Sequence, residues 1–258
     1  MAVEISIIVP VFNEADNVIP LAREVAAVME ATGRAWELVF VDDASTDDTW
    51  ARVRLAHERE ARVTGLRHAR NAGQSAALWT GIAATHAPVI ATLDGDLQND
   101  PADLPTMLAR LAEYDFVSGM RVNRQDSVVR RLSSRIARWA RRAVLGVDFR
   151  DTGCAMRVFR RSALEGVFPF NGLHRFLPVL VHGNGSRTLE MPVNHRPRVA
   201  GASKYGVWNR LGRGLYDLFA IAWYQRRRYR PVAVTRLGDA IAPVNAGTQQ
   251  TERRTTGR

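Results

Sequence analysis

Two scarcities set the first limits on this chain of 258 residues. Cys154 is its only cysteine, so the chain cannot form an internal disulfide, which favours a reducing compartment. It has no apolar run near the roughly 18 residues that a membrane-spanning helix needs. Its N-terminus enters an apolar strand without the basic region of a secretory signal. We therefore expect a protein that crosses no membrane, with one sizeable core.

Lysine is also nearly absent, because Lys204 is the only lysine among 36 basic residues. An ammonium is a compact point charge, whereas a guanidinium is a planar fork. The one retained lysine is therefore predicted to have a specific role, and the alternative is a solvated surface charge. The net charge of +10 predicts an anionic partner, which could be nucleic acid, a membrane surface or a phosphorylated substrate.

Strand-like and helix-like segments alternate along the first 120 residues. The predicted strands are 5–12, 36–41, 62–67, 88–93 and 115–120. The predicted helices are 16–33, 45–60, 73–85 and 101–113. This alternation predicts an α/β fold with a mostly parallel, Rossmann-like sheet covered on both faces. Ligands of such sheets bind at the carboxyl ends of the strands, where the chain places Asn13, Asp42, Asp43, Asp94 and Asp96.

The pattern changes after residue 120. Two amphipathic helices are predicted, at 127–145 and 207–224, and each has arginines beside its apolar stripe. The second precedes a basic cluster of Arg226, Arg227, Arg228 and Arg230. The polar end of the chain reads as a disordered tail. We therefore expect a catalytic domain over 1–206, an interfacial helix with its basic cluster over 207–230, and a tail over 231–258.

The segment VIATLDGDLQ at 89–98 carries the strongest chemical signal. It brings Asp94 and Asp96 to the end of a buried strand, where residues two apart point to the same side, and Gly95 leaves room between them. Two converging carboxylates repel each other unless a cation lies between them, and oxygen ligands suit Mg²⁺ or Mn²⁺. The alternative is an ordinary acidic turn.

Four segments together resemble family 2 glycosyltransferases. They are VPVFNE at 9–14, VDDASTDDT at 41–49, RNAGQSAA at 70–77 and LDGDLQNDP at 93–101. A fifth segment, HRPRVAGASKY at 195–205, makes the chain similar to one branch of this family, the dolichyl- and polyprenyl-phosphate glycosyltransferases. Dolichol-phosphate mannosyltransferase belongs to this branch. The resemblance implies the A-type glycosyltransferase fold, followed here by C-terminal amphipathic helices.

The resemblance implies a binding site for a nucleotide-sugar donor. Asp94, Asp96 and Gln98 would hold the metal and the diphosphate, with Asp96 also counted as catalytic. Asp42 would face the base, and Pro10, Phe12, Asn13 and Glu14 would line the base and ribose pocket. Asn71 and Gly73 would place backbone amides near the phosphates. For Asn13, Glu14, Asn71 and Gly73 the alternative is helix capping.

The acceptor side is implied to be a polyprenyl phosphate. Its phosphate, whose second pKa is about 6, is already ionised and needs cations more than a base. The candidates to bind it are Arg121, Arg131, Arg196, Arg198, Ser203 and Lys204. Asp151, in the segment DTGCAMR at 151–157, matches a family position near the acceptor, and HRFLP at 174–178 resembles the branch's acceptor-facing helix. Asp151, Arg121 and Lys204 are counted as catalytic together with Asp96. Any one arginine could instead be a solvated charge.

The sequence thus predicts an inverting glycosyltransferase that moves a sugar from GDP-mannose or a UDP-sugar to a polyprenyl or dolichyl phosphate. It would act as a peripheral protein on the inner, cytoplasmic face of an anionic membrane. Many relatives have C-terminal spanning helices, so we expect a membrane-protein partner or flippase here. One alternative is a family 2 enzyme with a saccharide or lipopolysaccharide acceptor. Another is a nucleic-acid-binding basic protein, although nucleic acid is not an expected partner because the arginines flank apolar stripes.

Overall fold

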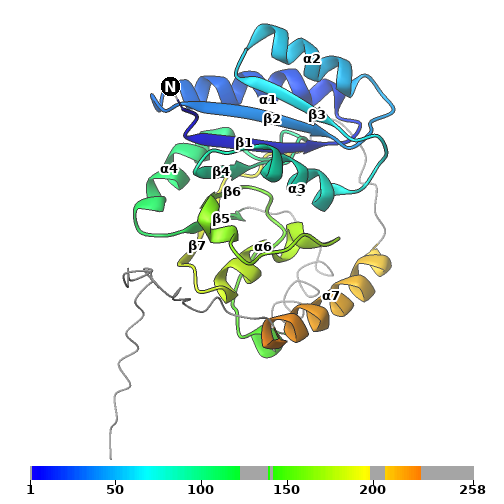
Figure 1. Cartoon of the computed structure of the whole chain (residues 1–258), viewed down its shortest axis with the longest axis vertical. Coiled ribbons are helices and arrows are strands. Elements are labelled where there is room, and N and C mark those ends of the chain that lie inside the picture. The colour runs from blue at the N-terminus through cyan, green and yellow to red at the C-terminus, as the bar shows by residue number, and fades with distance from the viewer. Residues whose placement is uncertain (1, 123–138, 140–141, 198–206, 228–258) are drawn as a thin grey trace, which may run out of the picture.

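The computed structural model describes residues 2–122, 139, 142–197 and 207–227. Within these residues one seven-stranded sheet has the order β3-β2-β1-β4-β6-β5-β7 (Figure 1). Its strands are β1 (Ile5–Val11), β2 (Trp36–Asp42), β3 (Val63–Arg67), β4 (Val89–Thr92), β5 (Phe116–Arg121), β6 (Arg157–Arg160) and β7 (Thr188–Val193). β1 to β4 are mutually parallel, β5 pairs with β7 in parallel, and β6 runs antiparallel to β4 and β5. The predicted, mostly parallel α/β sheet is confirmed.

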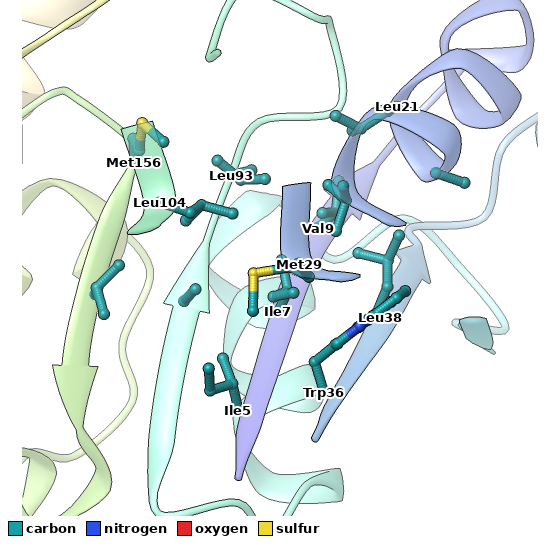
Figure 2. Packing of buried hydrophobic residues seen from close by; sticks show 14 of the residues in the cluster. Ile5, Ile7, Val9, Leu21, Met29, Trp36, Leu38, Leu93, Leu104 and Met156 are labelled. Carbon is teal, nitrogen blue, oxygen red and sulfur yellow. The ribbon is translucent and has the colours of Figure 1, made fainter. Parts of the chain in front are cut away.

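Helices cover both faces of the sheet because the strands are apolar on both sides. The helices are α1 (Ala15–Glu30), α2 (Thr49–Arg59), α3 (Gln74–Ala84), α4 (Leu104–Ala109), α6 (Leu173–Gly183) and α7 (Val207–Arg227). Along β1, Ile5, Ile7 and Val9 pack into one core with residues of α1, α2 and α4 (Figure 2). Ile8 packs into a second core with residues of α3 and α6. Strand alternation thus divides the hydrophobic residues between two cores.

Two predicted helices differ from those in the structure, one in its start and one in its continuity. α2 begins at Thr49 rather than at residue 45, because the Ser45 hydroxyl accepts a hydrogen bond from the Asn13 amide and does not cap the helix. The predicted helix 101–113 is instead a series of three pieces, η1 (Pro101–Asp103), α4 and η2 (Arg110–Ala112). Pro105 has no N–H to donate to the Pro101 carbonyl, so the first turn forms the tighter 3₁₀ bond from Leu104 to Pro101.

The sequence did not predict β6 or β7. β6 has only four residues and begins with a buried arginine, Arg157, so it lacks the apolar run of a central strand. β7 contains Pro192 and is largely half-buried, as expected of an edge strand. The antiparallel insertion of β6 between β4 and β5 brings the segment before it, 151–156, to the carboxyl end of β4.

α7 confirms the predicted helix over 207–224 and continues to Arg227. Of its predicted apolar stripe, Leu218 and Ala222 are buried, but Phe219 is on the exposed side. Most of the predicted helix 127–145 lies outside the described residues, as do Arg228, Arg230 and the predicted tail. None of the helices in the described part of the chain combines the length and the apolar character needed to cross a membrane.

Candidate active site

The candidate site lies where the chain leaves the carboxyl ends of β1, β2 and β4. Three non-glycine residues in these exits have positive φ angles, which are Asn13 (56°), Ala44 (59°) and Leu97 (62°). Residues other than glycine rarely adopt this conformation, and such strain gathers at functional sites. The three turns therefore mark the functional edge of the sheet.

The turns after β1 and β2 are held to each other by hydrogen bonds. The Asn13 side-chain oxygen accepts from the Thr46 amide at 2.8 Å, and the Asn13 amide donates to the Ser45 hydroxyl at 2.9 Å. The Glu14 amide donates to the Thr49 hydroxyl at 2.8 Å. Glu14 occupies the N-cap position of α1, but its side chain makes no capping bond to that helix. Asn13 and Glu14 thus shape the edge by joining two loops.

The carboxylates of Asp42 and Asp43 point into the protein. Asp42 is fully buried, its Oδ1 accepts from the Ser45 amide, and Arg67 Nε lies 3.2 Å from its Oδ2 as an ion pair. Asp43 accepts from the amides of Ala72 and Gly73 at 2.8 and 2.7 Å. The contact of Asp42 with a nucleotide base stays a prediction, and in this conformation its carboxylate is buried beside Arg67.

The loop before α3 is attached to the sheet through Asp43. Besides the Ala72 and Gly73 amides, the Asn71 side chain donates to the Asp43 carbonyl at 3.2 Å. The Gly73 amide, which was expected near the donor phosphates, is therefore already used inside the protein. This anchoring positions Gln74, the first residue of α3. The side-chain amide of Gln74 donates to Asp94 Oδ1 at 2.8 Å.

Asp94 and Asp96 belong to a turn and not to the strand, since β4 ends at Thr92. Strand alternation therefore does not place them, which corrects the geometric part of the prediction. Asp94 is half-buried, whereas Asp96 is 7% exposed and accepts from the Gln98 amide at 3.2 Å. The Asn99 side chain holds the turn by accepting from the Asp94 amide. A side chain on Gly95 would come within 2.6 Å of Val11 Cγ1, so glycine is needed for the close approach to β1.

Gln98 and Arg196 meet where the segment 194–197 passes the turn. The Gln98 side chain donates to the Arg196 carbonyl at 3.3 Å, and the Arg196 amide donates to the Gln98 carbonyl. The Arg196 guanidinium pairs with Glu24 at 2.7 Å and Asp100 at 2.6 Å. Arg196 thus has two carboxylate partners and no place on the cavity wall, so its expected contact with the acceptor phosphate has no support in this arrangement.

A cavity of about 350 Å³ opens beside Asp94. Its wall is contributed by the ends of β1, β4 and β5, the starts of α3 and α6, and the segment before β6. The lining residues are Pro10, Gln74, Leu78, Thr92, Leu93, Asp94, Arg121, Thr152, Gly153, Ala155, Arg157, His174 and Arg175. Pro10, Asp94 and Arg121 are therefore predicted site residues that the fold brings to one cavity.

Arg121 and Asp151 form an ion pair at the rim of this cavity. Arg121 Nε is 2.7 Å from Asp151 Oδ2, and Arg121 Nη2 is 2.8 Å from Oδ1. Burial opposes the charge of the guanidinium, but the bonds to Asp151 outweigh it and raise the pKa of Arg121 above its usual value. The two predicted catalytic residues therefore hold each other.

Several residues of the cavity were not among the predicted site residues: Gln74, Thr152, Arg157, His174 and Arg175. Gln74, Arg157, His174 and Arg175 lie within or beside motifs of the resemblance, so a signal existed for them. Ala155 also lines the cavity, whereas its neighbour Cys154 is buried in the core, where burial raises the pKa of the thiol to about 11. Phe12 is half-buried beside the site. Arg131, Arg198, Ser203 and Lys204 lie outside the described residues.

Comparison with known families decides the class of this protein. Residues 6–168 match the family described as glycosyl transferase family 2. The chain belongs to this family. It is 40% identical over 238 residues to the dodecaprenyl-phosphate galacturonate synthase of Rhizobium johnstonii, covering 89% of this chain and 70% of that protein.

A second relative is the undecaprenyl-phosphate 4-deoxy-4-formamido-L-arabinose transferase of Pseudomonas paraeruginosa. It is 37% identical over 216 residues, which cover 83% of this chain and 63% of that protein. The chain thus spans about two thirds of the length of these relatives. As the family assignment implies, the protein is a glycosyltransferase.

Solved structures share the fold. The mannosyltransferase of Pyrobaculum calidifontis, solved with GDP-Man and Mn²⁺, matches with a TM-score of 0.62 at 23% identity. The match covers 88% of this chain and 66% of the mannosyltransferase chain. The glucosyl-3-phosphoglycerate synthase of Mycobacterium tuberculosis, solved with Mn²⁺, UDP and phosphoglyceric acid, has a TM-score of 0.63 at 17% identity and covers 87% and 78%. The predicted A-type glycosyltransferase fold is confirmed.

Proposed function

We propose that this family 2 glycosyltransferase moves a sugar from a nucleotide-diphospho-sugar to a polyprenyl phosphate at a membrane surface. The observation that carries the proposal is the cavity at the carboxyl edge of the sheet, which joins Asp94 to several cationic side chains. Both substrates carry phosphate, and the cavity offers a carboxylate for a metal as well as arginines for anions. The names of the two relatives, both of them prenyl-phosphate enzymes, support the same substrate class.

The residues of the turn 94–98 fit a divalent cation. Asp94 lines the cavity and Asp96 follows two residues later, and both supply the hard oxygen ligands that Mg²⁺ or Mn²⁺ prefers. Among the described residues no cluster of three or more His, Cys, Asp or Glu side chains could complete a metal site. Such a site suits a cation that takes its remaining ligands from a substrate diphosphate. A cation bound there would stabilise the negative charge that develops on the departing nucleoside diphosphate.

The cavity suits an acceptor that needs no general base. A phosphate monoester is mostly dianionic at neutral pH, whereas a sugar hydroxyl must lose a proton during attack. His174, which lines the cavity, is a weak base, because burial and the nearby Arg175 and Arg157 lower its pKa to about 3. Both carboxylate oxygens of Asp151 already accept bonds from Arg121. These features favour a phosphate acceptor over the saccharide acceptor that the sequence left open.

The outer face of α7 is the candidate surface for the membrane. Tyr216, Phe219 and Trp223 are 78%, 64% and 66% exposed, and they follow one side of the helix, which lies far from α1 and α2 (Figure 1). Arg226 and Arg227 follow at its end. Exposed aromatics with adjacent arginines are typical of helices that lie in the headgroup region of an anionic bilayer. A peripheral position on the cytoplasmic face, and a membrane-protein partner, belong to the same proposal.

The direct test is transfer of radiolabelled sugar to undecaprenyl phosphate. The purified chain is incubated with Mn²⁺, the lipid in mixed micelles and one of a panel of UDP- and GDP-sugars, and label in the butanol phase is counted. We expect label in the lipid fraction with at least one donor, and its loss in Asp94→Asn. Asp48→Asn, which changes an exposed carboxylate of the same loop edge, is the control. Transfer to a free saccharide, with the lipid left unlabelled by every donor, would refute the proposal.

A further inference from the structure

One wall of the cavity presents hydrogen-bond donors. It is formed by Arg157 at the start of β6 and by His174 and Arg175 in the first turn of α6, and we call it the α6 wall. All three side chains line the cavity, and none of them is paired with a carboxylate among the described residues. This distinguishes them from Arg121, whose charge Asp151 balances.

Arg157 is a buried cation that forms no ion pair with any of the described residues, although the carboxylates of Asp94 and Asp151 lie near enough to favour its charge. It is 2% exposed, and its Nη2 donates to the carbonyls of Thr152 at 3.0 Å and His174 at 2.7 Å. Its Nε is buried and has no hydrogen-bond partner in the part of the chain that is described. Burial lowers the pKa of Arg157, as expected where a charge is costly. A ligand that brings negative charge to this wall would remove that cost.

Ser75 fixes the tautomer of His174. The Ser75 hydroxyl oxygen accepts from the amides of Gly172 at 3.0 Å and His174 at 3.4 Å, which together use both of its lone pairs, so its own proton is the one directed at His174 Nδ1, 2.6 Å away. A ring nitrogen that accepts a bond carries no proton, so the proton lies on Nε2. Since the pKa of His174 is about 3, the ring stays neutral at physiological pH. His174 therefore offers a permanent Nε2–H donor.

Arg175 completes the wall. Its side chain is half-buried, and its guanidinium forms neither an ion pair nor a hydrogen bond with any residue that the structure describes. A guanidinium only donates, and so does the Nε2–H of His174. A sugar hydroxyl both donates and accepts, so a subsite built for a hydroxyl would contain both donors and acceptors. A wall made only of donors matches a group that only accepts, which is a carboxylate or a phosphate.

We propose that the α6 wall is an oxyanion subsite in which Arg157, Arg175 and the Nε2–H of His174 bind a carboxylate or phosphate of a substrate. The inference rests on the proposed function and deepens it by naming the substrate chemistry. Two sources fit: a carboxylate on an acidic sugar that is transferred, or the phosphate of the acceptor. Ser75 is a positioning residue of this subsite, since it holds the His174 ring and the Gly172 amide at the start of α6 and is not itself a lining residue of the cavity.

Binding measurements separate the two sources. Calorimetric titrations in Mn²⁺ compare UDP-galacturonate, UDP-galactose, UDP and a short soluble isoprenyl phosphate on the wild type and on Arg175→Gln. The two nucleotide sugars differ by a carboxylate in place of a hydroxymethyl group. If the sugar supplies the anion, Arg175→Gln should lower the affinity for UDP-galacturonate about 10- to 100-fold and leave the affinity for UDP-galactose unchanged. If the acceptor supplies the anion, only the affinity for the isoprenyl phosphate should fall by that factor.

The controls address folding and location. Arg54→Gln makes the same charge change on the exposed face of α2 and should leave every affinity unchanged. Ser75→Ala should lower the same ligand's affinity by a smaller factor and should also lower the melting temperature, because the buried Gly172 amide loses its acceptor. Unchanged binding of all ligands to Arg175→Gln, or equal weakening of UDP itself, would overturn the subsite. Because these titrations measure no transfer, a chain that binds the anion but transfers no sugar would refute the proposed function alone.

Discussion

Arg121 and Asp151 form a two-point ion pair that fastens the end of β5 to the segment before β6. Their side chains are 19% and 8% exposed, and the Arg121 amide also donates to Asp151 Oδ2 at 3.2 Å. Glu190 of β7 extends the network by accepting from the amides of Arg150 and Asp151. Three parts of the chain that are distant in sequence therefore meet at the rim of the cavity.

Asp151→Asn should lower the free energy of unfolding by about 2–4 kcal/mol, because it leaves the Arg121 guanidinium without its carboxylate in a largely buried place. Urea unfolding measures this loss. Glu4→Gln breaks the exposed pair of Glu4 with Arg34 and should cost at most about 1 kcal/mol. Equal effects of the two substitutions would show that the pair at the cavity does not stabilise the fold.

Asp94→Asn should reduce transfer by about 100-fold or more, since a weakened metal site stabilises the departing diphosphate less. Its melting temperature should stay near that of the wild type, because Asp94 is half-buried and lies in a turn. Enhancement of water proton relaxation by bound Mn²⁺ gives an independent readout, which should fall in this variant. Wild-type turnover in excess EDTA would contradict a metal at this turn.

His174 makes stability depend on pH in a defined direction. Its folded pKa of about 3 lies below the unfolded value of 6.5, so as the pH falls below about 6.5 the unfolded chain takes up a proton that the folded chain does not. Stability is therefore lost on acidification, by about 1.4 kcal/mol per pH unit. Between pH 7 and pH 5 the wild type should lose about 2 kcal/mol more than His174→Gln. His86→Gln, at an exposed histidine, should behave as the wild type.

Gly95→Ala should destabilise the protein by about 1–3 kcal/mol, because the added methyl group would meet Val11 Cγ1 at 2.6 Å. Val11→Ala removes that atom, so the double variant should lose less stability than the sum of the single losses. Urea unfolding of all four proteins gives the coupling. Strict additivity would show that the turn relaxes away from β1 without needing space there.

Replacing Phe219 and Trp223 by serine should weaken sedimentation with anionic vesicles without changing nucleotide affinity, since both side chains are exposed on α7. Replacing Arg226 and Arg227 by glutamine should remove about 2 kcal/mol of the preference for anionic over neutral vesicles. Val3→Ser, which removes an exposed apolar side chain at the N-terminus, is the control. Equal binding of wild type and aromatic variants would assign the α7 face to another partner.

The sequence by itself determined the parallel half of the sheet and the edge of the sheet at which the candidate site lies. Long apolar runs such as 5–12 and 36–41 can only be central strands, and the acidic residues that follow them must gather where parallel strands end. The motif order also determined the family. These properties depend on patterns among residues that are close in sequence, so they can be recognised without knowing which distant segments are in contact.

Tertiary structure decided which polar groups face the cavity. Asp42 and Asp94 both follow strands in acidic motifs, yet Arg67 and Ser45 turn Asp42 inward while Asp94 lines the cavity. Arg157 and His174 come to share one cavity wall because β6 inserts beside β4 and Ser75 bonds to α6 across 99 positions of sequence. Burial and pairing are properties of contacts between distant segments, so no local pattern of residues could have assigned them.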